Sequence, residues 1–311
     1  MKLAMVFPGQ GSQSVGMMQG YGDLPAVRAV LAEASDVLGM DMAKLMSEGP
    51  AEALNSTVNT QPVMVTAGYA AYCAWREQGG PEPSIVAGHS LGEYTALVVS
   101  GAISFADCLP LVRYRAEAMQ LAVPAGVGAM AAVLGLDDAG ISAACAEAAQ
   151  GEVVDAVNFN APGQTVIAGH AGAVQRAIDA CKARGAKRAI ALPVSAPFHS
   201  ALMAPAAAKL AAYLEKVVIS APRIPVLHNL DVQTHGDATG IRQALVGQAD
   251  HAVRWVEIIQ KMAAQGVTHV AECGPGKVLA GMTKRIDGNL SGLALADRAG
   301  IDAALAAVKG G

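Results

Sequence analysis

Short runs of apolar residues alternate along the chain with stretches in which apolar positions recur every three or four residues. Four such runs, bounded by glycine or proline, predict buried strands at residues 3–7, 85–88, 225–230 and 270–273. The periodic stretches predict helices at residues 24–38, 60–78 and 253–265. Pro62 suits the first turn of the second helix. Strands and helices that alternate in this way are typical of an α/β fold with a parallel sheet.

Residues from about 125 to 195 follow a different pattern. Their strands are predicted at residues 129–134, 153–158, 164–169 and 187–192, and their helices at 138–150 and 171–184. The resulting order, βαββαβ, is that of a ferredoxin-like unit. We therefore predict a large α/β-hydrolase-like catalytic domain with a parallel sheet, formed by residues 1–124 and 196–311. A small ferredoxin-like domain, residues 125–195, is inserted into it.

Composition narrows the functional class. Apolar residues make up 53% of the 311 residues and charged residues 15%, so aliphatic side chains build the core. The net charge of −4 gives no support for binding to nucleic acid or to a membrane surface. No apolar span is long enough to cross a bilayer, and Pro8 interrupts the N-terminal run too early for a secretory signal. The five cysteines are scattered without metal or disulfide spacing, so we expect a reducing cytoplasm.

A Gly-x-Ser-x-Gly motif, Gly88-His89-Ser90-Leu91-Gly92, follows an apolar run and precedes a helical stretch. In the context of strand, sharp turn and helix, this motif is a nucleophile elbow. The two glycines fit a turn so tight that side chains would collide with neighbouring backbone. Ser90 would then stand at a helix N-terminus, where amide N–H groups favour a developing negative charge. The alternative is a glycine-rich turn with an incidental serine.

The next helix carries two arginines. It is predicted to begin near Ser104, which resembles an N-cap residue followed three positions later by an acid. Pro110 should kink this helix or delay its start. Arg113 can pair with Glu117, whereas Arg115 falls on the apolar face. A buried guanidinium needs an anionic partner, which is either a carboxylate of the protein or the carboxylate of a bound substrate.

Two further segments carry candidate chemistry. The glycine-rich loop at residues 8–13 follows the first strand, and the carboxyl ends of parallel strands are where α/β sheets bind ligands. A plain strand-to-helix turn is the alternative. His199 follows a proline-containing turn and is the best candidate for a general base, because His89 should point away from Ser90. A hydrogen-bonded loop histidine is the alternative there.

Five motifs stand in the order found in malonyl-CoA:acyl carrier protein transacylases, and the resemblance covers essentially the whole chain. They are Phe7-Pro8-Gly9-Gln10-Gly11-Ser12-Gln13, Gly88-His89-Ser90-Leu91-Gly92-Glu93-Tyr94, Arg115 with Met119-Gln120, Asn160-Ala161-Pro162-Gly163-Gln164 and Pro197-Phe198-His199. No single motif is decisive, but five in order around a ferredoxin-like insertion are very specific. The chain resembles the free-standing bacterial enzymes of type II fatty-acid synthesis.

The resemblance implies an enzyme that moves malonyl from malonyl-CoA to the phosphopantetheine thiol of acyl carrier protein. Ser90 would attack the malonyl thioester, and His199 would take its proton and later return one to the leaving thiolate. The backbone N–H groups of Gln10 and Leu91 would form the oxyanion hole. Arg115 would bind the free malonyl carboxylate through a two-pronged pair.

Three more residues receive expected roles from the resemblance. The backbone carbonyl of Gln248 would orient the histidine, so that no acid is needed. Asn160 would lie near the acyl pocket, and Phe198 would crowd a branching methyl group, which favours malonyl over methylmalonyl. Relatives often have Asn-Pro where this chain has His251-Ala252, a difference that bears on the geometry around Gln248.

The carrier protein is expected to be acidic, so docking on this acidic chain requires a local basic patch. The candidate residues lie in the small domain and are Lys182, Arg184, Lys187 and Arg188. A solvated helix end and strand start is the alternative. We expect no metal and no cofactor, since Gly9-x-Gly11 lacks the third glycine and the downstream acid of a dinucleotide site.

Three other functions fit part of the sequence. A serine thioesterase or hydrolase with the same elbow would explain Ser90 and His199 but would give Arg115 no role. A malonyl transferase could serve a polyketide carrier or a malonate decarboxylase carrier instead. A catalytically silent carrier-binding protein would form no acyl-enzyme, and the intact serine and histidine argue against it.

Overall fold

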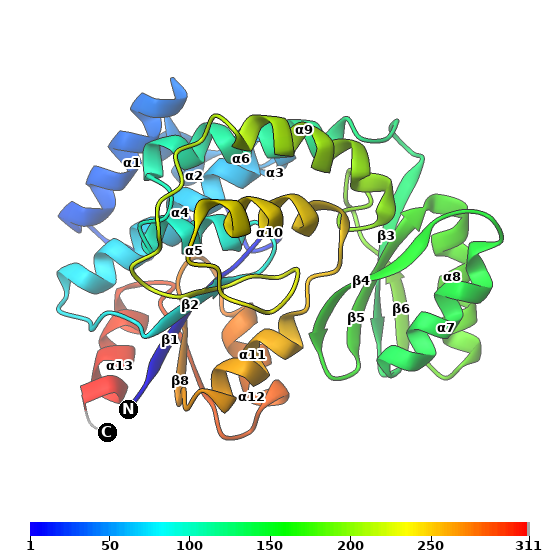
Figure 1. Ribbon diagram of the computed structural model, residues 1–311. Helices are drawn as coiled ribbons and strands as arrows, with labels where there is room; N and C mark the ends of the chain where they lie inside the picture. Colours follow the sequence, from blue (N-terminus) through cyan, green and yellow to red (C-terminus); the bar gives the residue numbers. More distant parts are fainter. Residues whose placement is uncertain (310–311) are drawn as a thin grey trace.

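The structure, a computed structural model that describes residues 1–309, contains a central sheet and a separate smaller sheet (Figure 1). The central sheet has five parallel strands in the order β7-β2-β1-β8-β9. They are β1 (Leu3–Phe7), β2 (Ile85–Gly88), β7 (Val226–Leu227), β8 (His269–Glu272) and β9 (Ser291–Ala294). The strand order reverses beside β1, and the crevice at such a reversal is where open α/β sheets bind ligands.

Helices cover both faces of the central sheet, which explains why its strands are uninterrupted apolar runs. Along β1, Leu3, Met5 and Phe7 enter one apolar core, whereas Ala4 and Val6 enter another. The surrounding helices are α1 (Pro25–Leu38), α2 (Met42–Glu48), α3 (Ala51–Asn55), α4 (Thr57–Glu77), α5 (Gly92–Val99), α6 (Phe105–Gln120), α9 (Ala204–Leu214), α10 (Ala238–Asp250), α11 (Trp255–Ala264), α12 (Val278–Ile286) and α13 (Arg298–Lys309), with the short 3₁₀ helices η1 (Gln19–Tyr21) and η2 (Ala201–Met203).

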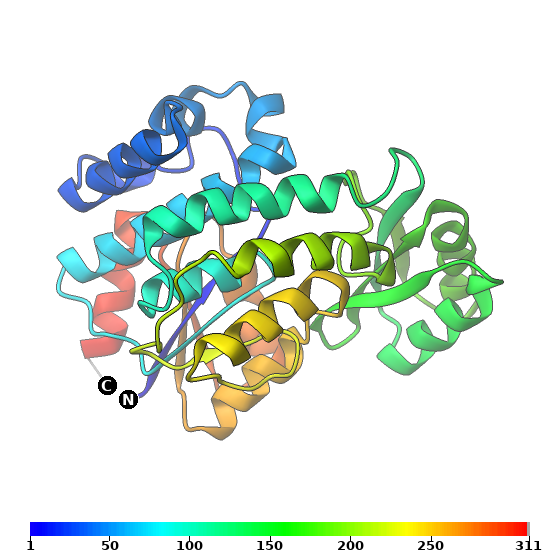
Figure 2. The same ribbon diagram turned by 45° about the horizontal axis from the view of Figure 1, so that its top comes forward.

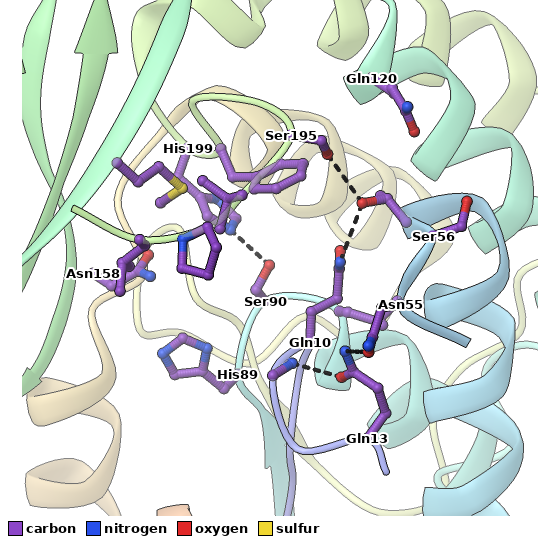
Figure 3. A pocket seen from close by; sticks show the side chains of 18 of the residues that line it. Gln10, Gln13, Asn55, Ser56, His89, Ser90, Gln120, Asn158, Ser195 and His199 are labelled. Atoms are coloured by element: carbon purple, nitrogen blue, oxygen red, sulfur yellow. Dashed lines mark hydrogen bonds between the residues drawn. The ribbon is translucent and has the colours of Figure 1, made fainter. Parts of the chain in front are cut away.

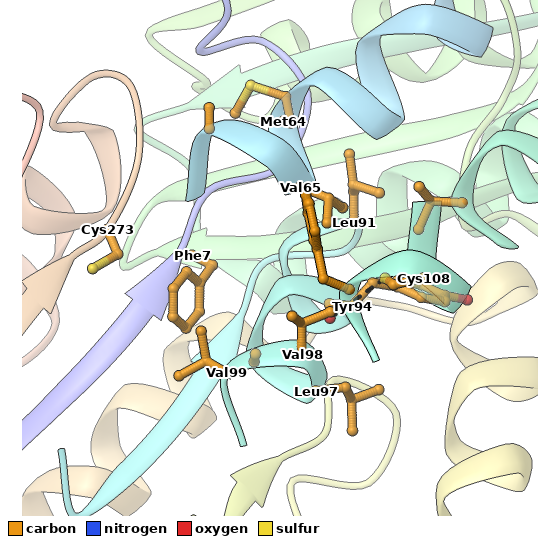
Figure 4. Close-up of a cluster of buried hydrophobic side chains, with 14 of the residues drawn as sticks. Phe7, Met64, Val65, Leu91, Tyr94, Leu97, Val98, Val99, Cys108 and Cys273 are labelled. Carbon is orange, nitrogen blue, oxygen red and sulfur yellow. Dashed lines mark hydrogen bonds between the residues drawn. The ribbon is translucent and has the colours of Figure 1, made fainter. Parts of the chain in front are cut away.

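The helices α6, α9 and α10 lie side by side across one face of the sheet (Figure 2). Beneath them, α5 passes through the larger core, and every one of its residues is buried. Figure 4 shows Tyr94, Leu97 and Val99 of this helix packed in the same cluster as Phe7 of β1. The helix that follows the candidate nucleophile is therefore held on all sides. Within residues 1–309, no helix has both the length and the apolar character needed to cross a bilayer.

Gly92, the first residue of α5, allows this helix to approach β1. A Cβ atom at this position would lie 2.0 Å from the backbone oxygen of Phe7. We expect Gly92→Ala to lower the free energy of unfolding by about 3 kcal/mol, because two well-packed elements would have to separate. The matched control is Gly288→Ala, because an added Cβ there has no heavy atom within 4 Å apart from its own chain neighbours. Urea unfolding of both variants makes the comparison, and equal stabilities would contradict the close approach.

The smaller sheet is antiparallel, with the strand order β4-β5-β3-β6, and α7 and α8 pack on one of its faces. In chain order its elements are β3 (Gly128–Leu134), α7 (Asp138–Ala149), β4 (Val154–Ala161), β5 (Gln164–His170), α8 (Ala171–Ala183) and β6 (Arg188–Ala191). This is the predicted βαββαβ order, and the predicted fold class is confirmed. The domain boundaries 1–124, 125–195 and 196–311 remain a prediction.

Strand β7 and helix α11 are shorter than expected. Strand β7 has two residues, although the pattern predicts a strand over 225–230. His228 and Asn229 leave the ladder because they bond to the buried carboxylate of Glu93. Helix α11 begins two residues later than predicted, because Val253 exchanges backbone hydrogen bonds with β4 instead.

The expectation for Pro62 is wrong, and so is one of the two alternatives for Pro110. Helix α4 begins five residues before Pro62, so this proline lies in the second helical turn rather than the first. Helix α6 begins directly after Ser104, whose hydroxyl accepts a hydrogen bond from the N–H of Asp107. Pro110 therefore does not delay its start. The predicted pair of Arg113 and Glu117 on the same helix is present, at 4.0 Å.

Candidate active site

The turn between β2 and α5 has the geometry of a nucleophile elbow. Ser90 has a φ of 49°, in the left-handed region that non-glycine residues rarely adopt. A Cβ atom on Gly88 would lie 1.8 Å from the carbonyl carbon of Gly92, so the turn closes only without a side chain there. Asn229 clamps the turn, because its Oδ1 accepts from the Ser90 N–H and its Nδ2 donates to the Gly88 oxygen, each at 2.7 Å. The surrounding structure thus holds the serine in a strained conformation.

Ser90 and His199 face each other across the site (Figure 3), with 2.6 Å between Oγ and Nε2. On the other side of the ring, Nδ1 lies 2.8 Å from the backbone oxygen of Gln248. A carbonyl oxygen can only accept, so Nδ1 carries the proton and Nε2 of the neutral ring is free to accept the serine proton. This chain has His251-Ala252 where relatives often have Asn-Pro, and the contact between His199 Nδ1 and the Gln248 oxygen is nevertheless present.

Burial is the main reason that the pKa of His199 is lowered from 6.5 to about 3, and the positive charge of Arg115 lowers it further. The imidazole is therefore neutral at pH 7. A neutral ring is the form that a general base requires.

We expect the rate of Ser90 acylation to stay level as the pH falls from about 8 to about 5. An ordinary histidine base would lose half its activity near pH 6.5, whereas His199 gains its proton only near pH 3. The unfolded chain binds that proton near pH 6.5, so His199 also contributes a loss of stability below that pH and none above it. Single-turnover acylation and denaturant midpoints across this range measure both effects. An inflection of the acylation rate near pH 6.5 would contradict the lowered pKa.

Arg115 points its guanidinium at the nucleophile. Its side chain is 2% exposed, and Nη2 lies 3.2 Å from Ser90 Oγ. Two neutral amides hold it: Nη1 donates to Gln61 Oε1 and Nη2 to Gln248 Oε1, each at 2.9 Å. None of the ion pairs among residues 1–309 involves Arg115. A buried cation without a carboxylate partner in the described chain favours an anion from a bound substrate.

A cavity of ≈ 700 Å³ opens between the two sheets, and Ser90, His199 and Arg115 line it. The N-terminal half of the chain contributes polar side chains to its wall: Gln10, Gln13, Asn55, Ser56 and Thr57. Apolar side chains come from β3 and from the segment after β6: Met130, Leu192, Pro193, Val194 and Phe198. Figure 3 shows Gln10 and Gln13 on one side of Ser90 and Asn158 on the other. The cavity can therefore hold a substrate with both polar and apolar parts.

Gln10 and Leu91, the predicted oxyanion-hole residues, both line the cavity beside Ser90. Among residues 1–309, neither backbone N–H donates a hydrogen bond to another part of the backbone. Leu91 is the N-cap residue of α5, so the positive end of the helix dipole lies at the same place. The arrangement can accommodate a developing negative charge.

The remaining predicted site residues lie in different places. Phe198 lines the cavity, whereas Asn160 does not. The Oδ1 of Asn160 lies 2.7 Å from Nε2 of His89, whose ring thus points away from the nucleophile as expected. Asn158 lines the cavity instead, because irregular pairing between β4 and β5 changes the side to which residues of β4 point. The four basic residues of the predicted patch are exposed and lie outside the cavity: Lys182, Arg184, Lys187 and Arg188.

Sequence reasoning missed the polar side chains that support the site. All four are fully buried: Gln61, Glu93, Asn229 and the side chain of Gln248. Three of them are hydrogen-bonded to the elbow or to Arg115, and Glu93 is bonded to two of those three, Asn229 and Gln248. One signal was available, because Glu93 is the one charged residue of the mainly apolar helix α5. The partners of these four residues could not be identified from spacing along the chain.

Comparison with known proteins agrees with this geometry. Residues 4–287 match the acyl transferase domain family. The malonyl CoA-acyl carrier protein transacylase of Salmonella typhimurium is 55% identical over 305 residues, which cover 98% of this chain and 99% of the relative. That of Bacillus subtilis is 43% identical over 310 residues, which cover 99% of this chain and 98% of the relative.

Solved structures show the same relationship. The acyl-carrier-protein S-malonyltransferase of Burkholderia pseudomallei superimposes with a TM-score of 0.97 at 61% identity, over 98% of this chain and 99% of that one. A malonyl-transacylase solved in complex with its type II PKS acyl-carrier protein has a TM-score of 0.97 at 50% identity, with 100% of both chains covered. The chain therefore belongs to the malonyl CoA-acyl carrier protein transacylases of the acyl transferase domain family.

Proposed function

We propose that the protein transfers malonyl from malonyl-CoA to the phosphopantetheine thiol of acyl carrier protein, in fatty-acid biosynthesis, through a malonyl ester on Ser90. Arg115 is the observation that carries this proposal. A malonyl group on Ser90 places its free carboxylate one methylene beyond the ester carbonyl, and the guanidinium Nη2 lies 3.2 Å from Ser90 Oγ. A buried cation this close to the nucleophile serves an acyl group that carries an anion.

In the first half-reaction, Ser90 Oγ attacks the thioester carbonyl while its proton moves to Nε2 of His199. The backbone carbonyl of Gln248 holds the ring through its Nδ1–H. The backbone N–H groups of Gln10 and Leu91 stabilise the tetrahedral oxyanion. When the C–S bond breaks, His199 gives its proton to the thiolate of CoA, which leaves as the free thiol.

In the second half-reaction, the thiol of the carrier protein takes the place of CoA. His199 accepts the thiol proton, the sulfur attacks the ester carbonyl, and Ser90 leaves with the proton that the imidazole returns. Water must be excluded between the two steps, because it would hydrolyse the ester. The apolar side of the cavity, with Met130, Leu192 and Phe198, limits its access. The bulk of Phe198 also disfavours a branched methylmalonyl group.

Intact-protein mass spectrometry tests the proposal directly. The native chain mixed with malonyl-CoA should gain one malonyl group, located on Ser90, and should lose it when phosphopantetheinylated carrier protein is added. Release of CoA with no ester and no malonyl-carrier would identify a serine hydrolase. No ester and no CoA release would identify a carrier-binding protein.

The choice of carrier is tested in the same assay. One similar structure is a complex with a type II PKS carrier, which supports a polyketide carrier as a second candidate. Carrier proteins of fatty-acid and polyketide synthesis should therefore be compared side by side, and faster transfer to the fatty-acid carrier is expected. We place the reaction in the reducing cytoplasm, which suits the five free cysteines.

The basic residues at the end of α8 and the start of β6 are the proposed docking site for an acidic carrier. All four are exposed: Lys182, Arg184, Lys187 and Arg188. The patch lies at the start of β6, and the residues that follow the end of this four-residue edge strand line the cavity. Arg184 already pairs with Glu147, which makes Lys182 the clearer test.

Lys182→Glu is expected to raise the KM for carrier protein by about 3- to 10-fold, because a rim charge acts mainly on the encounter of the two proteins. The acylation half-reaction with malonyl-CoA should not change. The matched control is Lys44→Glu on α2, which makes the same charge change at an exposed site away from β6. If carrier kinetics are the same in both variants, the patch is not the docking site.

A further inference from the structure

The side chain of Gln248 has a fixed polarity. Its Oε1 accepts from Arg115 Nη2 at 2.9 Å. Its Nε2 donates to the backbone oxygen of Ser90 at 3.0 Å and to Glu93 Oε2 at 2.9 Å. The backbone oxygen of the same residue holds His199. One residue therefore contacts the nucleophile, the base and the arginine, and its amide must present oxygen to the guanidinium.

Glu93 is one of the two acceptors that set which way that amide faces, and the backbone oxygen of Ser90 is the other. Its carboxylate is fully buried, and Oε1 accepts from Nδ1 of His228 at 2.7 Å. Oε2 accepts from the backbone N–H of Asn229 at 2.9 Å, in addition to the bond from Gln248. A carboxylate has no N–H to donate, so it can bind only the NH₂ end of the Gln248 amide. The oxygen of the amide must then face Arg115.

This arrangement leaves the positive charge of Arg115 free to bind a substrate carboxylate. A direct pair between Glu93 and Arg115 would neutralise the guanidinium, whereas here a neutral amide separates the two charges. Burial lowers the pKa of Arg115, and the neighbouring Tyr94 and Glu93 oppose that effect. If the amide were reversed, its N–H groups would face those of the guanidinium and displace it.

We infer that Glu93 is a positioning residue for acyl selection: by setting the polarity of the Gln248 amide, it holds the Arg115 guanidinium where the malonyl carboxylate binds. The inference rests on the proposed function, since it requires that a malonyl group reaches Arg115. Glu93 contacts neither the substrate nor the reacting atoms. Its hydrogen-bonded link to Arg115 runs through the Gln248 amide.

The test is the ratio of acylation rates with malonyl-CoA and acetyl-CoA, because acetyl has no carboxylate for Arg115. Glu93→Gln keeps the size of the side chain but adds N–H donors, so the Gln248 amide can reverse. The kcat/KM for malonyl-CoA should fall about 10- to 100-fold, a range set by the loss of one well-placed charged contact. The value for acetyl-CoA should stay within about 3-fold. Gln248→Met, which keeps the backbone carbonyl for His199, should change the ratio in the same direction.

Two further variants separate positioning from a general structural role. The control is His228→Gln, which touches the other oxygen of Glu93 and should leave the ratio unchanged. The double variant Glu93→Gln with Gln248→Met should have the ratio of Gln248→Met alone, because two residues that act in series are not additive. Circular dichroism and thermal unfolding establish that each variant is folded.

Four results would overturn the inference. Parallel losses with both acyl-CoAs, or additive losses in the double variant, would mean that Glu93 only supports the elbow. Tighter use of malonyl-CoA by Glu93→Gln would mean that its charge simply repels the substrate. If Glu93→Gln does not fold, an unchanged ratio of malonyl-CoA to acetyl-CoA acylation in Gln248→Met would also overturn the inference. Glu93 is linked to Arg115 through that amide. Failure of the native chain to form a malonyl ester would instead refute the proposed function.

Discussion

Replacing Ser90 by alanine is expected to slow malonyl transfer by about 10⁴- to 10⁶-fold, the range seen when a serine nucleophile is removed from a serine–histidine pair. The hydroxyl oxygen is the atom proposed to form the covalent ester, and without it the neighbouring groups can only bind and orient the substrate. The mass increase after mixing with malonyl-CoA should disappear, and transfer to the carrier should fall to background. A malonyl adduct that persists in Ser90→Ala would show that another residue is the nucleophile.

His199→Ala provides the matched comparison. In the native protein, His199 Nε2 lies 2.6 Å from Ser90 Oγ, so we expect the two residues to act as one unit. The double variant should be about as slow as either single variant, because groups that act together lose their effect together. Losses that multiply in the double variant would mean that the histidine does not activate this serine.

Arg115→Ala is expected to lower kcat/KM for malonyl-CoA by about 10²- to 10³-fold, which corresponds to the loss of a buried, hydrogen-bonded charge pair. Acetyl-CoA has no carboxylate, so its slow acylation should change much less and the two substrates should approach equal use. Competition between the two acyl-CoAs, followed by intact-protein mass spectrometry, measures the ratio. An unchanged preference for malonyl would show that the carboxylate binds elsewhere.

Two variants on the same helix control for charge and for geometry. Arg113→Ala removes a partly exposed arginine that pairs with Glu117, and it should leave the preference intact. Arg115→Lys keeps the charge but loses the planar pair of N–H groups. Its preference for malonyl-CoA should therefore lie between those of the native protein and Arg115→Ala. A lysine variant equal to the native protein would mean that charge alone selects malonyl.

The parts of the fold that could be predicted from sequence are those with a strong local cause. Strands β1 and β2 are apolar throughout because they are buried on both faces. Gly88 and Gly92 mark the elbow because no side chain fits there. The βαββαβ order of the small sheet and the α/β class were predicted from the apolar pattern, and the family from five motifs in order; all three are confirmed.

Other elements could not be predicted because tertiary contacts decide them. Strand β7 ends early where His228 and Asn229 turn to Glu93, and no periodicity marks that change. The elements that the pattern did not predict are α2, α3, α9, α10, α12, α13 and β9, with the short 3₁₀ helices η1 and η2. Several are short or rich in alanine, so their apolar faces are hard to distinguish from loops. Polar residues that act through one another were missed for the same reason, since their partners are far apart along the chain.

Gln248 contributes its backbone to the base and its side chain to the arginine. Every amino acid has a backbone carbonyl, so a substitution at this position keeps the group that contacts His199 and changes what the side chain does at Arg115, Ser90 and Glu93. A change at this codon would therefore shift which acyl group the enzyme prefers while ester formation continues. Position 248 is thus a place where natural variation or protein engineering can broaden the substrate range without first losing the reaction.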